Sequence, residues 1–324
     1  KIRDVRKLIE QKKYKEAENV IPDALISKNY RPQTAFPLPI CDFKIKMPLE
    51  KFPKEYSRAL NMETGEAAVM YRDGATKYER KMFVSRENDM FIMEITKYGS
   101  GTINAQFSFD LHDRSCARTP GGMLSKLPEF VTENYQPYFM FFSARKDNGT
   151  EFGAVERVSY YGGTQEVKDN CLCVKGAGSV LVIIKLFTES QREKEWKNIK
   201  TELAANKLNY DKMFKLHSNI HSKLFGSAEI DLRPDDREQS AEQLLADTQN
   251  SKSVLFERLW QMGRYLFISS AREDGSLIVY PYGLWCGDYK AVKAYPDFSG
   301  KTQNMYRFAF DNNLCDMVLT LKSG

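Results

Sequence analysis

The stretch LFERLWQMGRYLFISSAREDGSLIVYPYGLWCGDY, residues 255–289, decides the fold class of the second half of the chain. Its first half predicts a helix over about Ser253–Ser269 that is apolar on nearly all sides. A helix of that kind belongs in a protein interior, packed among other helices. The residues up to Gly324 supply too few helices to surround it. The sequence therefore predicts a helical second domain that is cut short.

The second half of the stretch gathers aromatic and polar side chains: Tyr280, Tyr282, Trp285, Asp288 and Tyr289. Sugars present apolar C–H faces that stack on Trp and Tyr rings, and a carboxylate can fix their hydroxyl groups. This cluster would therefore suit one wall of a sugar-binding cleft. An aromatic-rich loop is also a common core or interface segment, so both interpretations remain open.

Upstream, the region from Tyr56 to Phe187 has the pattern of β-strands. Asp73-Gly74 is the residue pair of a tight hairpin turn. Ile103–Asp110 (INAQFSFD) alternates strictly between apolar and polar residues, which is typical of an antiparallel strand with one exposed face. Further runs of this kind are Met90–Ile95, Tyr138–Ala144, Val155–Tyr161 and Val180–Phe187. The sequence predicts a large antiparallel β-sandwich over roughly residues 25–190.

Helical patterns lie on both sides of this region. Ile2 to about Val20 predicts an amphipathic helix, and the prolines from Pro22 to Pro48 exclude long regular elements after it. Another helix is expected over Ser240–Asp247. Between Phe187 and that helix, one helical stripe is predicted, with His221 beside it: Tyr210, Met213, His217, Ile220 and Leu224.

The charge pattern narrows the class of partner. The net charge of +5 comes from 48 basic and 43 acidic residues that are mixed along the chain, as in Arg192–Lys200 (REKEWKNIK). No basic stripe is present, so we expect no nucleic-acid partner. No apolar run approaches the length of a membrane span, so we expect no membrane partner.

The residues that most often bind metals form no recognised pattern. His217 and His221 are four apart on a predicted helix, but no Glu between them completes an HExxH motif and no third ligand is indicated. We expect structural histidines packed against the sandwich, and no metal or cofactor. The cysteines fit no zinc or CxxC spacing and are expected to be scattered buried thiols, with Cys171 and Cys173 on one face of a strand: Cys41, Cys116, Cys171, Cys173, Cys286 and Cys315.

Several segments, taken in order, resemble glycoside hydrolase family 95, the α-L-fucosidase and α-L-galactosidase group. They are IRDVRKLIEQKKYKEAENV, LNMETG, YERKMFVS, HSNIHSKLFGSAEIDL, GRYLFISSAREDGS and YGLWCGDYKAV. The resemblance implies an α+β multidomain fold. Residues 1–190 would hold the N-terminal helix and an antiparallel, supersandwich-like β-domain, and 191–250 a helical linker. Residues 251–324 would begin an (α/α)6 barrel that is incomplete in this chain.

The resemblance also implies an inverting exo-glycosidase that removes terminal α-L-fucose or α-L-galactose from an oligosaccharide, located outside the cell or in the periplasm, with no leader visible. The implied substrate-binding candidates are Tyr282, Trp285, Asp288 and Gln303. The family positions its attacking water with two asparagines, and Ser299 and Lys301 occupy those places here. The catalytic acid and base are expected beyond Gly324.

Three explanations of this departure remain open. The first is that the chain is a fragment of a longer gene product. The second is that its last 30 or so residues are divergent or mis-read sequence. The third is that the protein is a degenerate relative that binds glycans without cutting them. The sequence gives no indication of the oligomeric state.

Overall fold

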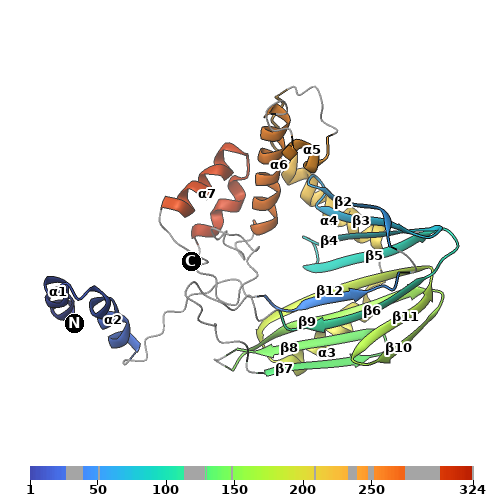
Figure 1. Cartoon of the computed structure of the whole chain (residues 1–324), viewed down its shortest axis with the longest axis horizontal. Coiled ribbons are helices and arrows are strands. Elements are labelled where there is room, and N and C mark those ends of the chain that lie inside the picture. The colour runs from blue at the N-terminus through green and yellow to red at the C-terminus, as the bar shows by residue number, and fades with distance from the viewer. Residues whose placement is uncertain are drawn as a thin grey trace. The chain divides into compact units, whose positions relative to one another are not determined.

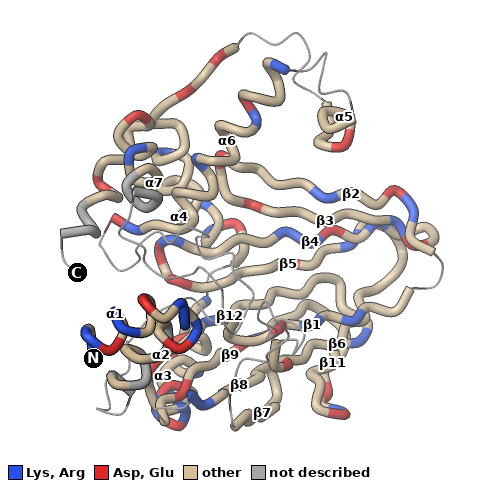
Figure 2. The backbone as a smooth tube through the Cα atoms, turned by 60° about the vertical axis from the view of Figure 1, so that its left-hand side comes forward, with Lys and Arg blue, Asp and Glu red and all other residues tan. Residues whose placement is uncertain are grey.

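The computed structural model describes residues 1–26, 39–49, 52–112, 128, 130–146, 149–207, 209–232, 239–246, 252–273 and 300–322. Contacts divide the chain into two units, Lys1–Phe36 and Pro37–Gly324, each of which is treated by itself. No helix among the described residues is both long enough and apolar enough to span a membrane. Figure 2 shows basic and acidic residues interspersed along the strands and helices.

The first unit contains two helices, α1 (Ile2–Glu10) and α2 (Tyr14–Ile26). The single helix predicted over Ile2–Val20 is therefore wrong. Lys12 adopts a left-handed conformation with φ 60°, and the next N–H groups bond back into the helix, Lys12 to the carbonyl of Ile9 and Lys13 to that of Leu8, each at 2.9 Å. This is the hydrogen-bond pattern of a Schellman helix end, here formed without glycine. The second helix also continues past Pro22, where a break was expected.

The second unit is built on two antiparallel sheets that form a sandwich (Figure 1). The four-stranded sheet has the order β1 (Asp42–Lys46), β6 (Ile103–Asp110), β11 (Cys171–Ala177), β10 (Thr164–Lys168). The eight-stranded sheet has the order β2 (Lys54–Asn61), β3 (Glu66–Asp73), β4 (Thr76–Val84), β5 (Met90–Tyr98), β12 (Ser179–Ser190), β9 (Glu151–Tyr161), β8 (Phe139–Arg145), β7 (Phe130–Gln136). The predicted antiparallel sandwich is confirmed.

The main core lies between the two sheets. β6 contributes its alternating apolar residues, all buried, as the sequence predicted: Ile103, Ala105, Phe107 and Phe109. The tight turn predicted at Asp73-Gly74 joins β3 to β4, with Gly74 at φ 58°. Of the cysteines, Cys173 is buried, Cys41 and Cys171 are half-buried, and Cys315 is exposed, so the expectation of buried thiols is wrong for Cys315. Cys116 and Cys286 lie outside the described residues.

Glu156 is an unusual member of this core. It lies on β9, its side chain is fully buried, and neither carboxylate oxygen has a hydrogen-bond partner among the described residues. Burial raises its pKa well above the ordinary value for a glutamic acid, because an ionised carboxylate would lose its hydration there. Glu156 therefore carries its proton in the folded protein.

A second core lies on the outer face of the large sheet, under α3 (Arg192–Ala205) and α4 (Tyr210–Phe225). Strand β12 supplies Val182 to the inner core and Ile183 to this outer one, so it is buried on both faces. That explains its nearly continuous apolar run, SVLVIIKLF. The buried face of α4 is Tyr210, Met213, His217 and His221. The predicted stripe is thus correct in its first half, whereas His221 takes the place expected for Ile220 and Leu224.

The remaining described helices are α5 (Ala241–Ala246), α6 (Lys252–Ser270), α7 (Gly300–Asp311) and the 3-10 helix η2 (Cys315–Lys322). A third core lies between α6, α7 and η2. The predicted helices at Ser240–Asp247 and Ser253–Ser269 are confirmed as α5 and α6. However, α6 is not buried on all sides: Phe256 is 61% exposed and Leu259 58% exposed. The described helices pack against its C-terminal half, where Phe267 and Ile268 are buried.

The buried side chain of Arg264 on α6 links this helix to the ends of α4 and α7. Its side chain is fully buried, and its guanidinium donates to the carbonyls of Leu224 (2.8 Å) and Phe225 (2.8 Å) at the end of α4, and of Asn312 (2.6 Å) just after α7. Ser227 Oγ accepts a further bond at 3.1 Å. The negative C-terminal ends of two helices therefore offset this buried positive charge.

Candidate functional site at the junction of sheet and helices

Most of the predicted sugar-binding residues lie outside the part of the chain that the structure describes. This applies to Tyr282, Trp285 and Asp288, and to Ser299. Lys301 and Gln303 lie in the first turn of α7. Their assignment to a substrate cleft therefore stays a prediction.

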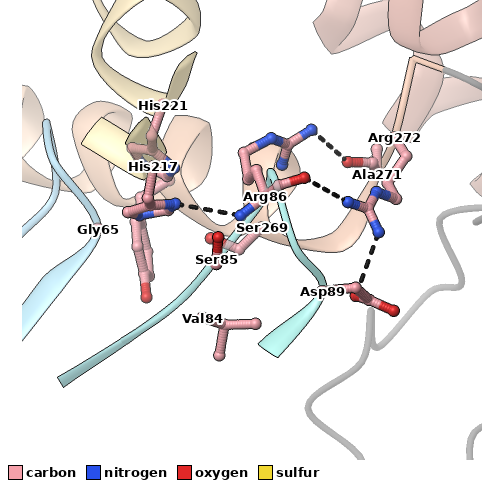
Figure 3. Close-up of a pocket in the computed structure, with 11 residues that line it drawn as sticks. Gly65, Val84, Ser85, Arg86, Asp89, His217, His221, Ser269, Ala271 and Arg272 are labelled. Carbon is pink, nitrogen blue, oxygen red and sulfur yellow. Dashed lines mark hydrogen bonds and ion pairs between the residues drawn. The ribbon is translucent and has the colours of Figure 1, made fainter. Parts of the chain in front are cut away.

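A pocket of about 300 Å³ does lie where α6 leads into this segment (Figure 3). Four parts of the fold meet there: the turn before β3, the end of β4 with the turn after it, the buried face of α4 and the C-terminal end of α6. The lining residues are Gly65, Val84, Ser85, Arg86, Asp89, His217, His221, Tyr265, Ser269, Ala271 and Arg272.

Two arginines form hydrogen bonds across this junction, one from the sandwich to the end of α6 and the other from the end of α6 to the sandwich. Arg86, after β4, donates to the carbonyl of Ile268 at 2.6 Å and to that of Ala271 at 3.1 Å. Arg272, just after α6, donates to the carbonyl of Arg86 at 2.7 Å and forms an ion pair with Asp89 at 3.2 Å. The carbonyls at the end of α6 have no partner within the helix, and the helix dipole favours a cation there. We call these four side-chain links the arginine clamp; it fixes the end of α6 against the sandwich.

His217 closes the pocket from the side of α4. Its ring stacks on Phe83 of β4 at 4.9 Å between centroids, and its Nδ1 accepts the backbone N–H of Arg86 at 3.3 Å. The ring proton therefore resides on Nε2. Nε2 lies so close to Gly65, which has φ 72°, that a Cβ at that position would approach it to 3.0 Å. A glycine is required at this turn for both reasons.

His221 lies one helical turn further on, with its Nε2 3.1 Å from the carbonyl of Met62. Burial lowers the pKa of both histidines to about 4, and their mutual repulsion adds to the effect at His217. Both are therefore neutral at pH 7. The prediction that His217 and His221 pack against the sandwich is confirmed. Among the described residues, no group of three or more potential ligands could hold a metal ion.

The arrangement positions a chain segment and does not itself supply hydrolytic chemistry. Glycoside hydrolysis requires a pair of carboxyl groups, and Asp89 is the only carboxylate among the lining residues. Instead, the arginine clamp fixes the last turn of α6, Ala271 and Arg272 against the sandwich. Arg86, Asp89 and Arg272 were not recognised as functional from the sequence, where each stands in a polar turn-like segment.

Comparisons with known proteins match the sheet-rich and the helical parts of the chain to two different family models. Residues 1–193 match the model of the glycosyl hydrolase family 65 N-terminal domain, and residues 209–318 match that of the glycosyl hydrolase family 95 catalytic domain. The chain is 22% identical to "Alpha-L-fucosidase 2" of Arabidopsis thaliana over 317 residues, covering 88% of this chain and 37% of that protein.

Among solved structures, a human-microbiome protein described as a kojibiose phosphorylase superposes with a TM-score of 0.58 at 10% identity, over 89% of this chain and 39% of the other. This likeness shows a shared fold. The chain thus spans less than two fifths of the length of each of these two relatives.

Proposed function

This chain carries the N-terminal domain of glycosyl hydrolase family 65 over residues 1–193 and matches the family 95 catalytic domain over residues 209–318, and on that premise we propose that the protein is an exo-glycosidase that removes terminal α-L-fucose or α-L-galactose from oligosaccharides with inversion. The sandwich and linker, residues 1–190 and 191–250, would support the catalytic domain that begins at about residue 251. That domain would be an (α/α)6 barrel.

The arginine clamp is the observation that carries the proposal. It joins the sandwich to the last turn of α6, from which the chain continues to Tyr282, Trp285 and Asp288. A sugar-binding loop gives useful affinity only if its aromatic side chains are held in place before the sugar arrives. On this proposal, Arg86 and Arg272 hold the end of α6 from which such a loop begins.

The inverting mechanism requires one protonated carboxyl group to assist the leaving sugar and one carboxylate to activate water, about 6.5–9.5 Å apart. The residues that would orient the water differ in this chain. Ser299 can donate and accept hydrogen bonds as an asparagine does, but Lys301 can only donate and adds a positive charge. This difference favours a second candidate function, a glycan-binding protein that does not hydrolyse its ligand.

Hydrolysis separates the two candidates. The native gene product is incubated with 4-nitrophenyl α-L-fucoside and α-L-galactoside, and proton NMR identifies the first anomer released. We expect the β-anomer, as inversion requires. If no α-L-glycoside is cleaved, the enzyme function is rejected and the binding function remains.

Calorimetry then tests the binding function on the 324-residue chain. Wild-type protein is titrated with a fucosylated oligosaccharide and compared with Trp285→Ala. The matched control is Tyr161→Ala, which removes an aromatic ring that is 80% exposed on the sandwich. Loss of heat with Trp285→Ala alone supports binding by the aromatic segment. Absence of heat with the wild-type chain rules it out.

A further inference from the structure

A second pocket lies at the opposite end of the β3–β4 hairpin. Its volume is about 380 Å³, within the range of small-molecule sites. Its walls are the β3–β4 turn, the turn between β5 and β6, and the residues after β1. Thr76 in this pocket and Val84 in the junction pocket are the two ends of β4, a strand of nine residues. At about 3.3 Å per residue, the two pockets are separated by roughly 30 Å.

The pocket is formed by tightly connected turns. The backbone N–H of Gly101 donates to Thr76 Oγ1 at 2.9 Å, and the Tyr78 hydroxyl donates to the carbonyl of Thr102 at 3.1 Å. A Cβ at Gly101 would approach Thr76 Oγ1 to 2.5 Å, so the close contact requires glycine. Because hydrogen bonds already hold these turns together, ligand binding would require little further ordering of the chain and would lose little affinity to that entropy cost.

The lining has the chemistry of a site for a neutral, polyhydroxylated molecule. The rings of Tyr71 and Tyr78 stack at 5.4 Å and provide an aromatic wall. Asp73, buried at 8% exposure, is the one charged residue among the lining residues, and no Lys or Arg is among them. Arg80 contacts two of these lining residues, with its guanidinium 5.7 Å from the centre of the Tyr71 ring and 3.2 Å from Met47 Sδ, but it does not itself line the pocket. With Asp73 as the one charged lining residue, a neutral ligand is favoured over an anion. Asp73 already has an interaction partner, which weakens its attraction for a free cation.

Asn104 adds a directed hydrogen-bond donor. Its Oδ1 accepts the backbone N–H of Gly176 at 2.9 Å, which fixes the orientation of the amide. Within the described part of the chain its NH₂ group has no hydrogen-bond partner. An aromatic wall, a buried carboxylate, hydroxyl groups and an amide donor together suit sugar hydroxyls and C–H faces. We propose that this pocket binds a neutral saccharide, remote from the junction pocket.

This site goes beyond the proposed function, because it requires no hydrolysis. At about 30 Å from the junction, it would hold a distant part of a long glycan or a neighbouring glycan chain. An enzyme with such a site would remain on a polymeric or clustered substrate after releasing one terminal sugar.

The test uses Asn104→Asp in the full chain. The substitution keeps the acceptor for Gly176 but replaces the NH₂ donor by a carboxylate oxygen. The matched control is Gln106→Glu, the same charge change two residues along the exposed face of β6 and outside the pocket. L-fucose, D-galactose, D-glucose and choline are titrated separately, and amide NMR shifts of Ala75, Gly101 and Thr102 report occupancy.

We expect at least one sugar to shift these amides in the wild-type protein and in Gln106→Glu. In Asn104→Asp the affinity for a sugar should stay within about tenfold of the wild-type value, because a sugar hydroxyl can donate to the new carboxylate in place of accepting from the NH₂ group. Ala75→Trp, which fills the pocket from the exposed hairpin turn, should abolish the shifts. Hydrolysis of the nitrophenyl glycosides is measured separately on the wild-type gene product and does not depend on the amide shifts, so the two proposals fail independently.

Two results would overturn the assignment. In the first, no sugar shifts these amides up to high millimolar concentration. In the second, choline binds and Asn104→Asp strengthens its binding by more than about tenfold, because an added carboxylate attracts a cation far more strongly than it attracts a neutral sugar.

Discussion

Lowering the pH from 7 to 5 should destabilise this protein through His217 and His221. Both are buried, at 3% and 2% exposure, and both have their pKa lowered from 6.5 to about 4. The unfolded chain binds protons at these two histidines as the pH falls through 6.5, whereas the folded chain resists until about pH 4. Stability is therefore fully present at neutral pH and is lost as the pH falls through this window.

The magnitude follows from the two pKa values. For one histidine, proton binding stabilises the unfolded protein relative to the folded protein by about 0.2 kcal/mol at pH 7 and by about 2 kcal/mol at pH 5. The two histidines together should thus lower the free energy of unfolding by about 3–4 kcal/mol between pH 7 and pH 5, which is a large share of the ordinary stability of a domain. Exposed carboxylates titrate mainly below pH 5 and contribute little within it.

The assay is urea unfolding, followed by far-ultraviolet circular dichroism, at half-unit steps from pH 7 to pH 5. The comparison is the double variant His217→Gln/His221→Gln. A glutamine can still accept from the N–H of Arg86 and donate to the carbonyl of Met62, but it does not titrate. Glu156, whose pKa is raised by burial, is present in both proteins, so its contribution cancels in the difference.

The wild-type protein should lose about 3–4 kcal/mol more than the double variant between pH 7 and pH 5. Parallel pH profiles for the two proteins would refute the assignment of buried neutral histidines. A steeper loss in the double variant would refute it as well.

Three further substitutions test other parts of the structure. Arg264→Met should lower the unfolding free energy by about 3–5 kcal/mol in urea titrations, since it leaves buried carbonyls at two helix ends without a donor; an unchanged midpoint would contradict this. Glu156→Met should stabilise the protein, with a gain that grows as the pH rises above about 4.5, the ordinary pKa of a glutamic acid, because the folded-state pKa of Glu156 is raised well above that value and the unfolded chain ionises first. A pH-independent effect would show that Glu156 is solvated. Arg86→Ala should speed amide hydrogen exchange in the last turn of α6 and leave exchange in β6, the internal control, unchanged. Equal exchange rates in the variant and the wild-type protein would show that the arginine clamp does not stabilise the end of α6.

The sandwich could be predicted because its signals are local. In Ile103–Asp110, every second residue is apolar, and that alternation alone determines which face is buried. The break at Lys12 could not be predicted in this way. It depends on a lysine in a left-handed conformation, and neither glycine nor proline marks the position.

The site was harder to predict because its contacts join distant parts of the chain. Arg86 and Arg272 each follow a regular element in a polar segment, where a charged residue ordinarily faces water. Only the folded chain brings them within 2.7 Å, across 186 positions of sequence. One signal was present: Arg264 interrupts the apolar helix α6, and a charge there requires buried acceptors.

Strand β12 has a consequence for how the protein is made. β2 to β5 form successive hairpins, as do β7 to β9, and β12 pairs with both β5 and β9. It is also the last of the described strands along the chain. During synthesis, both groups can form while the facing edges of β5 and β9 still lack a partner, and unpaired edges invite pairing with other chains. A nascent chain halted before Ser179 therefore has two open sheet edges, and the 12 residues of β12 close both at once.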